Sequence, residues 1–400
     1  MNKKSEFDAT SSALGYIYQV RYALLAALKK ITSVADPDDF NISIETLDDV
    51  AFDENGTPET LLQTKYHGSP GNITDRSPDI WKTLRVWIES HHNNIIDFNN
   101  SSLFLITTET AKKNSLAYYL SEDKDKRDTS KAIKKLEEIS KTVPSNENKS
   151  GFEAFNSLTP SQVLSLIKNI YIIGNTDDII KIREQVKANL RIGTSKQYME
   201  AFTSRLEGKW FKLVIETLES SCGVINLGEL VELIDDLREE FLPGNLPADY
   251  SDLCIDSLGV SIENKIFLQQ IQLIGGGDRL IQNAFENYYR SYEQRCRWSK
   301  DGLLKPGELK KYMQRLKDEW DLQCGILELK YTNNNDENKR LFGVDVYEYC
   351  QKEGALPIRT NFTENYVARG TYHALSNSLE IGWHPDYLTL VKESSEQDVA

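Results

Sequence analysis

Alternating apolar and polar residues predict a small antiparallel hairpin near the N-terminus. Residues 42–44 and 50–52 each alternate between apolar and polar side chains, with a short bend between them. Asn55-Gly56 then supplies the positive φ angles that a tight hairpin turn requires. The segment 60–67 is therefore predicted to be the partner strand, and the stretch 41–67 to be the centre of the fold.

Longer stretches with helical spacing flank this hairpin. Residues 10–34 carry an apolar stripe that a sheet would bury, and Gln19 within it either packs with the helix or reaches a functional site. Ser77-Pro78 starts a second helix, where Trp81 and Trp87 share one stripe and are predicted to be core residues. The remaining predicted elements of this half are strands at 102–108 and 169–174 and helices at 176–190 and 196–219.

The chain is too long for one typical domain. Cys222-Gly223 is the first convincing boundary, and it is followed by a strongly acidic helix at 227–241 and a proline-containing loop at 242–249. Beyond that loop the pattern is mainly helical. We therefore predict an α/β domain over residues 1–221, with a mixed sheet flanked by helices, and a mainly α-helical domain over residues 222–400.

Composition narrows the possible functions. The five cysteines are scattered and odd in number, and neither they nor the five histidines show metal-site spacing. The N-terminus is polar and no window is apolar enough to span a bilayer, so a cytoplasmic protein with no membrane partner is expected. A net charge of −14 argues against a protein that simply coats DNA, because such affinity comes from neutralised phosphates. It does not exclude basic groups that line one cleft.

Candidate chemistry gathers at one end of the predicted hairpin. Gln63 and Lys65 lie two residues apart and so share a strand face. Asp49 falls near that face, with Glu45 or Asp48 as further acids. A carboxylate and a second oxygen ligand can hold Mg²⁺ and activate its bound water. A lysine ammonium beside them can orient that water and offset charge on a phosphate.

This spacing resembles the PD-(D/E)xK nuclease superfamily. Asp49 would be the first acid, and Gln63-Thr64-Lys65 stands in place of the usual (D/E)xK. An amide binds Mg²⁺ less well than a carboxylate does, which favours Glu45 or Asp48 as a helper ligand. Which of Asp48 and Asp49 faces the metal stays open, because a one-residue register slip exchanges them. The structural alternative is that Asp48-Asp49 caps a strand end and Lys65 is an edge residue.

The C-terminal half contains aromatic residues among charged ones, in the segments 297–320, 369–377 and 381–387. Such a composition suits packing within the domain or a surface that recognises another protein. A catalytic cluster is the weaker alternative, because no nucleophile has a convincing base and orienting group. The residues of that alternative are Arg369, Tyr372, His373, Trp383 and His384.

The order of motifs along the chain resembles known defence proteins. The N-terminal half contains GYIYQ, ETLDDVAF, LLQTKYH and DIWKTLRVW, and it resembles the double-stranded DNA endonuclease domain of bacterial CBASS effectors. The C-terminal half contains RWSKDGLLKPGEL, RGTYHALSN and IGWHPDY, and it resembles the C-terminal domain of effectors from ABC-three-component systems. Together the two halves are similar to the nuclease subunits of Lamassu defence systems, the LmuA or DdmA type.

The resemblance implies a metal-dependent double-stranded DNA endonuclease that serves a bacterial anti-phage or anti-plasmid defence complex. It implies Mg²⁺ as cofactor, with Mn²⁺ as the alternative ion. The implied partners are double-stranded DNA, an SMC-like ATPase subunit (LmuB type) that regulates the nuclease, a small subunit (LmuC type) and, after activation, further copies of the chain.

Carried onto this sequence, the resemblance places catalysis at Asp49, Gln63 and Lys65, with Glu45 as a fourth residue. The implied metal ligands are Asp49, Gln63, Glu45 and the Thr64 carbonyl. Two alternatives remain open at this point. One is a catalytically inactive scaffold or adaptor subunit of the same kind of complex, and the other is a nuclease directed at RNA.

Overall fold

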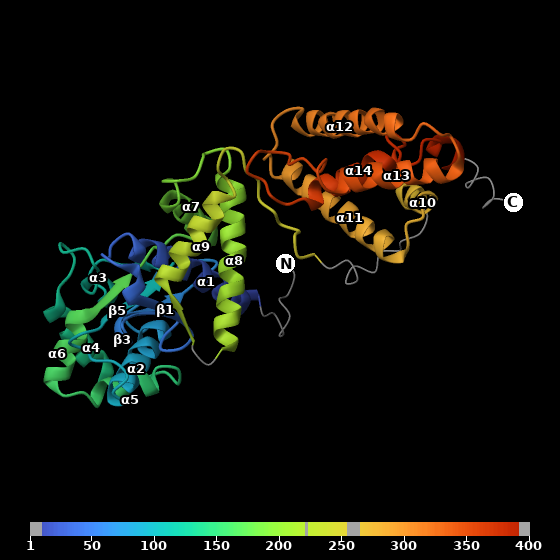
Figure 1. The fold of residues 1–400 in the computed structure, drawn as a ribbon. Coiled ribbons are helices and arrows are strands. Elements are labelled where there is room, and N and C mark those ends of the chain that lie inside the picture. Colours follow the sequence, from blue (N-terminus) through green and yellow to red (C-terminus); the bar gives the residue numbers. More distant parts are fainter. Residues whose placement is uncertain (1–9, 221–222, 254–264, 392–400) are drawn as a thin grey trace, which may run out of the picture. The chain divides into compact units, whose positions relative to one another are not determined.

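The computed structural model describes residues 10–220, 223–253 and 265–391. The chain divides into two compact units, an N-terminal unit of residues 1–237 and a C-terminal unit of residues 238–400 (Figure 1). None of the described helices combines the length and the apolar character needed to cross a lipid bilayer.

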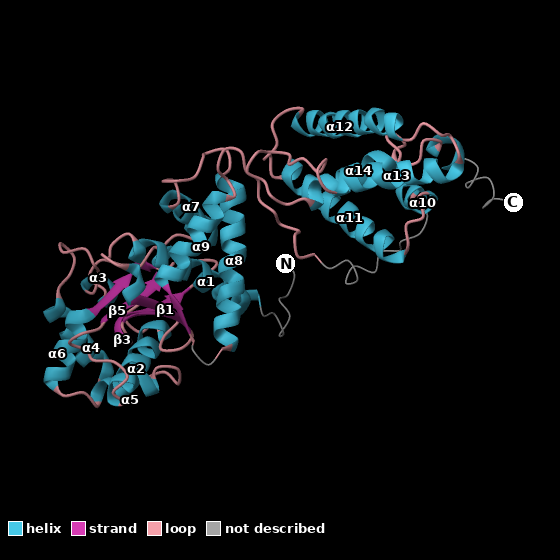
Figure 2. Cartoon of the chain, viewed as in Figure 1, coloured by secondary structure: helices cyan, strands magenta, loops and turns pink. Residues whose placement is uncertain are grey.

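A mixed sheet forms the centre of the N-terminal unit (Figure 2). Its strand order is β7-β5-β3-β2-β1-β8. Strands β7, β5 and β3 are parallel, whereas β3, β2, β1 and β8 pair antiparallel. The bounds are β1 Phe40–Ile44, β2 Val50–Glu54, β3 Thr57–Lys65, β5 Ser102–Thr107, β7 Ile170–Ile173 and β8 Val224–Asn226. The predicted mixed sheet and its central hairpin are thereby confirmed.

The hairpin follows from the local sequence. Asn55 and Gly56 have φ angles of 49° and 84°, as a tight turn between β2 and β3 requires. A separate short ladder pairs β4 (Asn72–Ile73) with β6 (Thr110–Ala111). This ladder was not predicted, and it ties the loop after β3 to the loop after β5.

Helices cover both faces of the sheet. The odd-numbered side chains Leu61, Leu103 and Leu105 join one large core with helices α2 to α6, and α1 covers the opposite face. Trp81 and Trp87 are fully buried on α2, as predicted. The helices of this unit are α1 Thr10–Ile31, α2 Pro78–His92, α3 Leu116–Tyr119, α4 Thr129–Ser140, α5 Lys149–Asn156, α6 Pro160–Asn169, α7 Ile179–Asn189, α8 Met199–Glu219 and α9 Leu227–Glu239, with the 3-10 turn η1 Pro37–Asp39.

The boundary between the units lies later than the sequence suggested. The predicted division falls at residues 221 and 222, which are outside the described part of the chain. Directly after it, β8 pairs with β1, so this segment belongs to the N-terminal sheet. A three-residue strand carries too little periodic signal to be recognised from sequence.

The C-terminal unit is helical in its described part, as predicted. Its helices are α10 Ile266–Leu273, α11 Asp278–Lys300, α12 Glu308–Lys330, α13 Asp336–Gln351 and α14 Tyr366–Asn377. Helices α11 and α14 pack closely at Gly370. A Cβ there would lie 2.0 Å from the carbonyl oxygen of Asn287. Three cysteines of the described residues, Cys296, Cys324 and Cys350, are free thiols, and Cys222 and Cys254 lie outside them.

Four side chains singled out from the sequence of this unit lie in its core. Tyr372, His373 and Trp383 are fully buried, and His384 is 8% exposed. Burial lowers the pKa of His373 to about 3, which keeps its imidazole neutral. Of the two predicted roles, packing is therefore confirmed for these four side chains and the interface role is not, because their surface is already covered within the unit.

The packing of α5 on α2 gives a stability test. A Cβ on the buried Gly151 would lie 2.5 Å from the carbonyl oxygen of Trp81, so Gly151→Ala is expected to lower the free energy of unfolding by about 1–3 kcal/mol. The matched control is Gly208→Ala on the exposed side of α8, where nothing lies within 4 Å. The control should raise stability by about 0.5–1 kcal/mol. Urea unfolding followed by circular dichroism measures both, and an unchanged Gly151→Ala midpoint would contradict the packing.

Candidate functional site

The hairpin brings four polar residues together at one end of the sheet. Val50 pairs with Leu62, which places Asp49 opposite Gln63. Asp49 Oδ1 accepts a hydrogen bond from Gln63 Nε2 at 2.5 Å. Asp49 Oδ2 accepts one from the backbone N–H of Thr64 at 2.7 Å and one from its hydroxyl at 3.1 Å. The carboxylate of Asp49 is thus fixed by the strand that carries the other candidate residues.

Lys65 completes this polar cluster. Its Nζ donates to Gln63 Oε1 at 2.9 Å and lies 3.7 Å from Asp49 Oδ2. The side chains of Lys65 and Asp49 are 26% and 16% exposed, so both retain some contact with solvent. The structure therefore gathers Asp49, Gln63 and Lys65, and it adds the Thr64 hydroxyl, which strand alternation alone placed on the other face.

Asp48 lies on the buried side of this cluster, where its carboxyl also interacts with the Gln63 side chain. Its Oδ2 accepts a hydrogen bond from Trp87 Nε1 at 2.7 Å, and its Oδ1 accepts one from the Asp49 backbone N–H at 3.0 Å. Burial raises the pKa of Asp48 to about 7, and the neighbouring charge of Asp49 adds to the rise. Of the two acids that the sequence left open, Asp49 is the one beside Lys65.

Gln19 of α1 fixes the backbone of Asp49. The buried side chain of Gln19 donates from Nε2 to the carbonyl oxygen of Asp49 at 2.7 Å. Gln19 of the GYIYQ motif is therefore a buried residue of α1 that also positions Asp49. Tyr18, one residue before it, stacks on Tyr66 with ring centroids 5.1 Å apart, which holds α1 against the end of β3.

Glu45 does not join the cluster. It is exposed, and its backbone has the uncommon left-handed φ of 58°. Among the described residues its side chain makes no hydrogen bond or ion pair. Burial raises the pKa of Tyr16 on α1, and the negative charge of Glu45 adds a smaller increase. Glu45 lies in the bend between β1 and β2, where alternation along a strand no longer predicts the face of a residue.

Helix α2 supplies residues that sequence reasoning missed. Thr83 Oγ1 lies 3.5 Å from Gln63 Oε1, and Trp87 one turn later contacts Asp48. Asp79, one turn earlier, contacts His67 through its carboxylate at 2.8 Å from Nε2. The sequence shows that Asp79, Thr83 and Trp87 are spaced four residues apart on α2. It does not show which residues of β3 they contact. Linear spacing of histidines likewise gave no sign of this His67 contact.

The donor set suits a small divalent cation. Asp49, the Gln63 amide and the Thr64 carbonyl provide oxygen atoms, which Mg²⁺ prefers. Of these three ligands only Asp49 is charged. One carboxylate is enough to bind Mg²⁺ where phosphate groups of the substrate complete the coordination. The Gln63 nitrogen faces Asp49 in the present arrangement, so its Oε1 would reach a shared ion only after the amide turns over.

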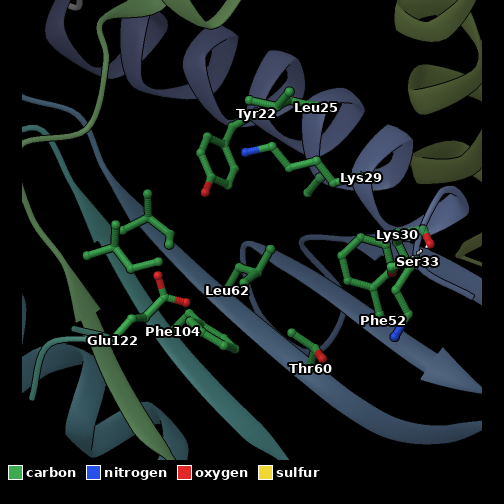
Figure 3. A pocket seen from close by; sticks show the side chains of 13 residues that line it. Tyr22, Leu25, Lys29, Lys30, Ser33, Phe52, Thr60, Leu62, Phe104 and Glu122 are labelled. Atoms are coloured by element: carbon green, nitrogen blue, oxygen red, sulfur yellow. Dashed lines mark hydrogen bonds between the residues drawn. The ribbon is translucent and has the colours of Figure 1, made fainter. Parts of the chain in front are cut away.

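A separate pocket lies on the opposite face of the sheet, under α1 (Figure 3). It encloses about 500 Å³ and is lined mostly by apolar side chains, with Lys29, Lys30 and Glu122 among them. Thr60 and Leu62 of β3 face it, whereas Gln63 and Lys65 do not line it. Because side chains alternate along a strand, this pocket lies on the opposite face of β3 from Gln63 and Lys65.

The raised pKa of Asp48 makes stability depend on pH. Between pH 3.8 and about 7 the folded chain holds this carboxyl protonated while the unfolded chain ionises it. Its contribution to stability is therefore fully present below pH 3.8 and is lost as pH rises through 7.

Asp48→Asn removes this dependence and keeps an acceptor for the Trp87 indole. The difference in unfolding free energy between the variant and the unaltered chain should grow in favour of the variant by on the order of 1–3 kcal/mol from pH 5 to pH 8. Urea midpoints in the presence of a chelator measure the difference. A difference that stays constant across this range would contradict the burial of an uncompensated carboxyl.

Comparisons with known proteins place only part of the chain. A search of curated sequences finds no match. The Acinetobacter baumannii Cap4 SAVED/CARF-domain containing receptor with the cyclic trinucleotide 3'3'3'-cAAA has a TM-score of 0.32 and 13% identity, over 70% of this chain and 69% of that one. Without the nucleotide the values are 0.30 and 12%, over 73% and 70%. Residues 267–391 match the family model of C-terminal domain 7 of the ABC-three component systems, so the C-terminal unit carries a domain typical of these multicomponent systems.

Proposed function

We propose that the chain is a Mg²⁺-dependent endonuclease for double-stranded DNA and the effector of a bacterial defence complex of the three-component type. The observation that carries the proposal is the convergence of Asp49, Gln63 and Lys65 at one end of a single hairpin. An acid, an amide oxygen and an ammonium beside a partly exposed edge are the groups that metal-assisted phosphodiester hydrolysis uses.

Oxygen atoms of the chain would hold the metal. Asp49 provides the carboxylate, and Gln63 Oε1 and the Thr64 carbonyl provide neutral oxygens. When bound, Mg²⁺ lowers the pKa of a water molecule and polarises the phosphate. Gln19 and Thr64 hold Asp49 in place from both sides, so little reorganisation of this carboxylate is needed.

Lys65 acts on the water and on the phosphate. Its ammonium lies between Asp49 and Gln63 and keeps contact with solvent. From there it donates a hydrogen bond to the attacking water and offsets the charge that develops on the phosphate oxygens. Asp48 acts as a positioning residue through Trp87 and the Asp49 backbone. Glu45 has no part in this mechanism, because its exposed side chain makes no contact with the cluster in the described chain.

The C-terminal unit is proposed to dock the nuclease to its partners. The family match over residues 267–391 supports this, and the resemblance to Lamassu subunits names an SMC-like ATPase and a small subunit as those partners. One stripe of α12 is apolar and exposed, with Leu322 59%, Ile326 51% and Leu329 82% accessible. Their spacing of four and three residues puts them on one helix face, a suitable contact for another helix.

A non-catalytic scaffold is the second candidate. The observation that favours it is the Gln63 amide nitrogen, which faces Asp49 where many nucleases of this type would carry a second carboxylate. The net charge of −14 also weakens binding to DNA unless a partner or an activated assembly supplies basic surface. A catalytic assay separates the two candidates.

Cleavage of supercoiled plasmid in Mg²⁺ tests the catalytic assignment. Lys65→Ala should lower the rate by about 10²–10³-fold, because one donor to the developing charge is lost. Gln63→Glu should retain or raise the rate, because a carboxylate binds Mg²⁺ more strongly than an amide. The exposed Lys82→Ala on α2 is the matched control and should cleave normally.

The assay is run on the isolated chain and on the chain co-expressed with the other subunits of its system. Full activity in Lys65→Ala would refute the mechanism. No metal-dependent cleavage in either preparation would favour the scaffold. An RNA substrate of equal length in parallel tests the remaining alternative, a nuclease directed at RNA.

Docking through α12 is tested by co-purification. Ile326→Glu places a charge in the exposed apolar stripe, so it should abolish recovery of the ATPase subunit on the tagged chain. Leu388→Glu, a change of the same kind at a leucine that is 49% exposed elsewhere in the C-terminal unit, should leave recovery intact. Equal recovery with both variants would exclude the stripe as the docking contact.

A further inference from the structure

Three metal-ligating side chains gather beside the polar cluster from separate parts of the chain. His67 follows the end of β3, Asp79 lies in the first turn of α2, and Glu109 follows the end of β5. One ligand atom from each lies within 4.8 Å of those of the other two. The His67 Nε2 and Asp79 Oδ2 atoms are 2.8 Å apart.

The backbone around this group is fixed by contacts between the strand ends. The N–H of His67 donates to Thr108 Oγ1 at 2.9 Å, and the Thr108 hydroxyl donates back to the His67 carbonyl at 3.1 Å. The carbonyl of Glu109 accepts from the N–H of Asn175 at 2.7 Å. Asp79 is held by a helix of 15 residues. The three side chains therefore start from rigid positions, as a preorganised ligand set requires.

The loop after β3 lies against the third ligand. Pairing of Asn72 with Thr110 brings this loop beside Glu109, and a Cβ on Gly71 would lie 3.6 Å from Glu109 Oε1. His67 and Asp79 are 39% and 21% exposed. The group is thus half-enclosed, with an opening to solvent through which an ion can enter.

The ligand chemistry favours a transition metal over Mg²⁺. One imidazole nitrogen and two carboxylates suit Zn²⁺ and its neighbours, whereas Mg²⁺ prefers oxygen ligands alone. Ligands at about 2.1 Å from a tetrahedral ion lie roughly 3.4 Å apart. The observed separations reach from 2.8 Å to within 4.8 Å, so small side-chain rotations close the site. Without an ion, two carboxylates face one imidazole, an arrangement that a divalent charge stabilises.

This group is distinct from the Asp49 cluster. Along α2, Asp79 contacts His67, while Thr83 lies beside Gln63. Four helical residues correspond to a rise of about 6 Å. The two groups are therefore neighbours on the same side of β3 but do not share a ligand.

We propose that His67, Asp79 and Glu109 form a Zn²⁺ site that joins the end of β3, the start of α2 and the end of β5. Three protein ligands leave a coordination position for water or for a ligand with an anionic oxygen. The site does not depend on the nuclease function, because its ligands and its ion are different.

Zn²⁺ titration of the full-length chain tests this site. After treatment with a chelator and dialysis, the chain should bind one Zn²⁺ ion at these ligands and its melting temperature should rise, since an ion that binds only the folded state stabilises it. Co²⁺ should give a visible absorption spectrum upon binding, a readout that needs no enzymatic activity. His67→Ala and Glu109→Gln should each weaken Zn²⁺ binding by about tenfold or more.

Two variants serve as controls. His92→Ala changes an exposed histidine on the same helix as Asp79 and should bind Zn²⁺ normally. Asp49→Asn should also keep this binding event, which distinguishes the two groups. Glu109→Gln conserves shape, so it remains informative if His67→Ala fails to fold. Zn²⁺ binding that is absent from the unaltered chain, or that is unchanged in Glu109→Gln, would overturn the proposal.

Discussion

The carboxylate of Asp49 is held by the strand that faces it, and the organisation of the N-terminal unit depends on this contact. Thr64 donates to it through both its backbone and its hydroxyl, and Gln63 donates through its amide. Gln19 fixes the carbonyl of the same residue from α1. Because β3 holds the carboxylate and α1 holds the backbone of Asp49, the ammonium of Lys65 has a defined place beside it.

The two faces of β3 have different surroundings. On one face Gln63 meets the polar side chains of α2, and on the other Leu62 lines an apolar pocket under α1. The polar cluster therefore sits on a strand with helices on both sides, a support that holds side chains in a precise geometry. Asp48 extends the polar contacts into the core, where the Trp87 indole compensates part of the cost of burying a carboxyl.

Much of this could be predicted where the signal was local. Alternation and Asn55-Gly56 predicted the hairpin, and the hairpin register then placed Asp49 with Gln63 and Lys65. The rest depends on contacts between distant segments. Glu45 is exposed in a bend where its own backbone is left-handed, which strand alternation could not predict. The His67 group combines a strand end, a helix start and a loop, so no spacing in the sequence could reveal it.

The most direct test of the central claim is the Mg²⁺ dependence of plasmid cleavage by the unaltered chain and by Asp49→Asn, each assayed with the subunits of its complex. The account predicts saturable dependence on Mg²⁺ for the unaltered chain and loss of cleavage for the variant at every Mg²⁺ concentration. Cleavage that persists in excess chelator, or equal Mg²⁺ dependence in both proteins, would contradict it.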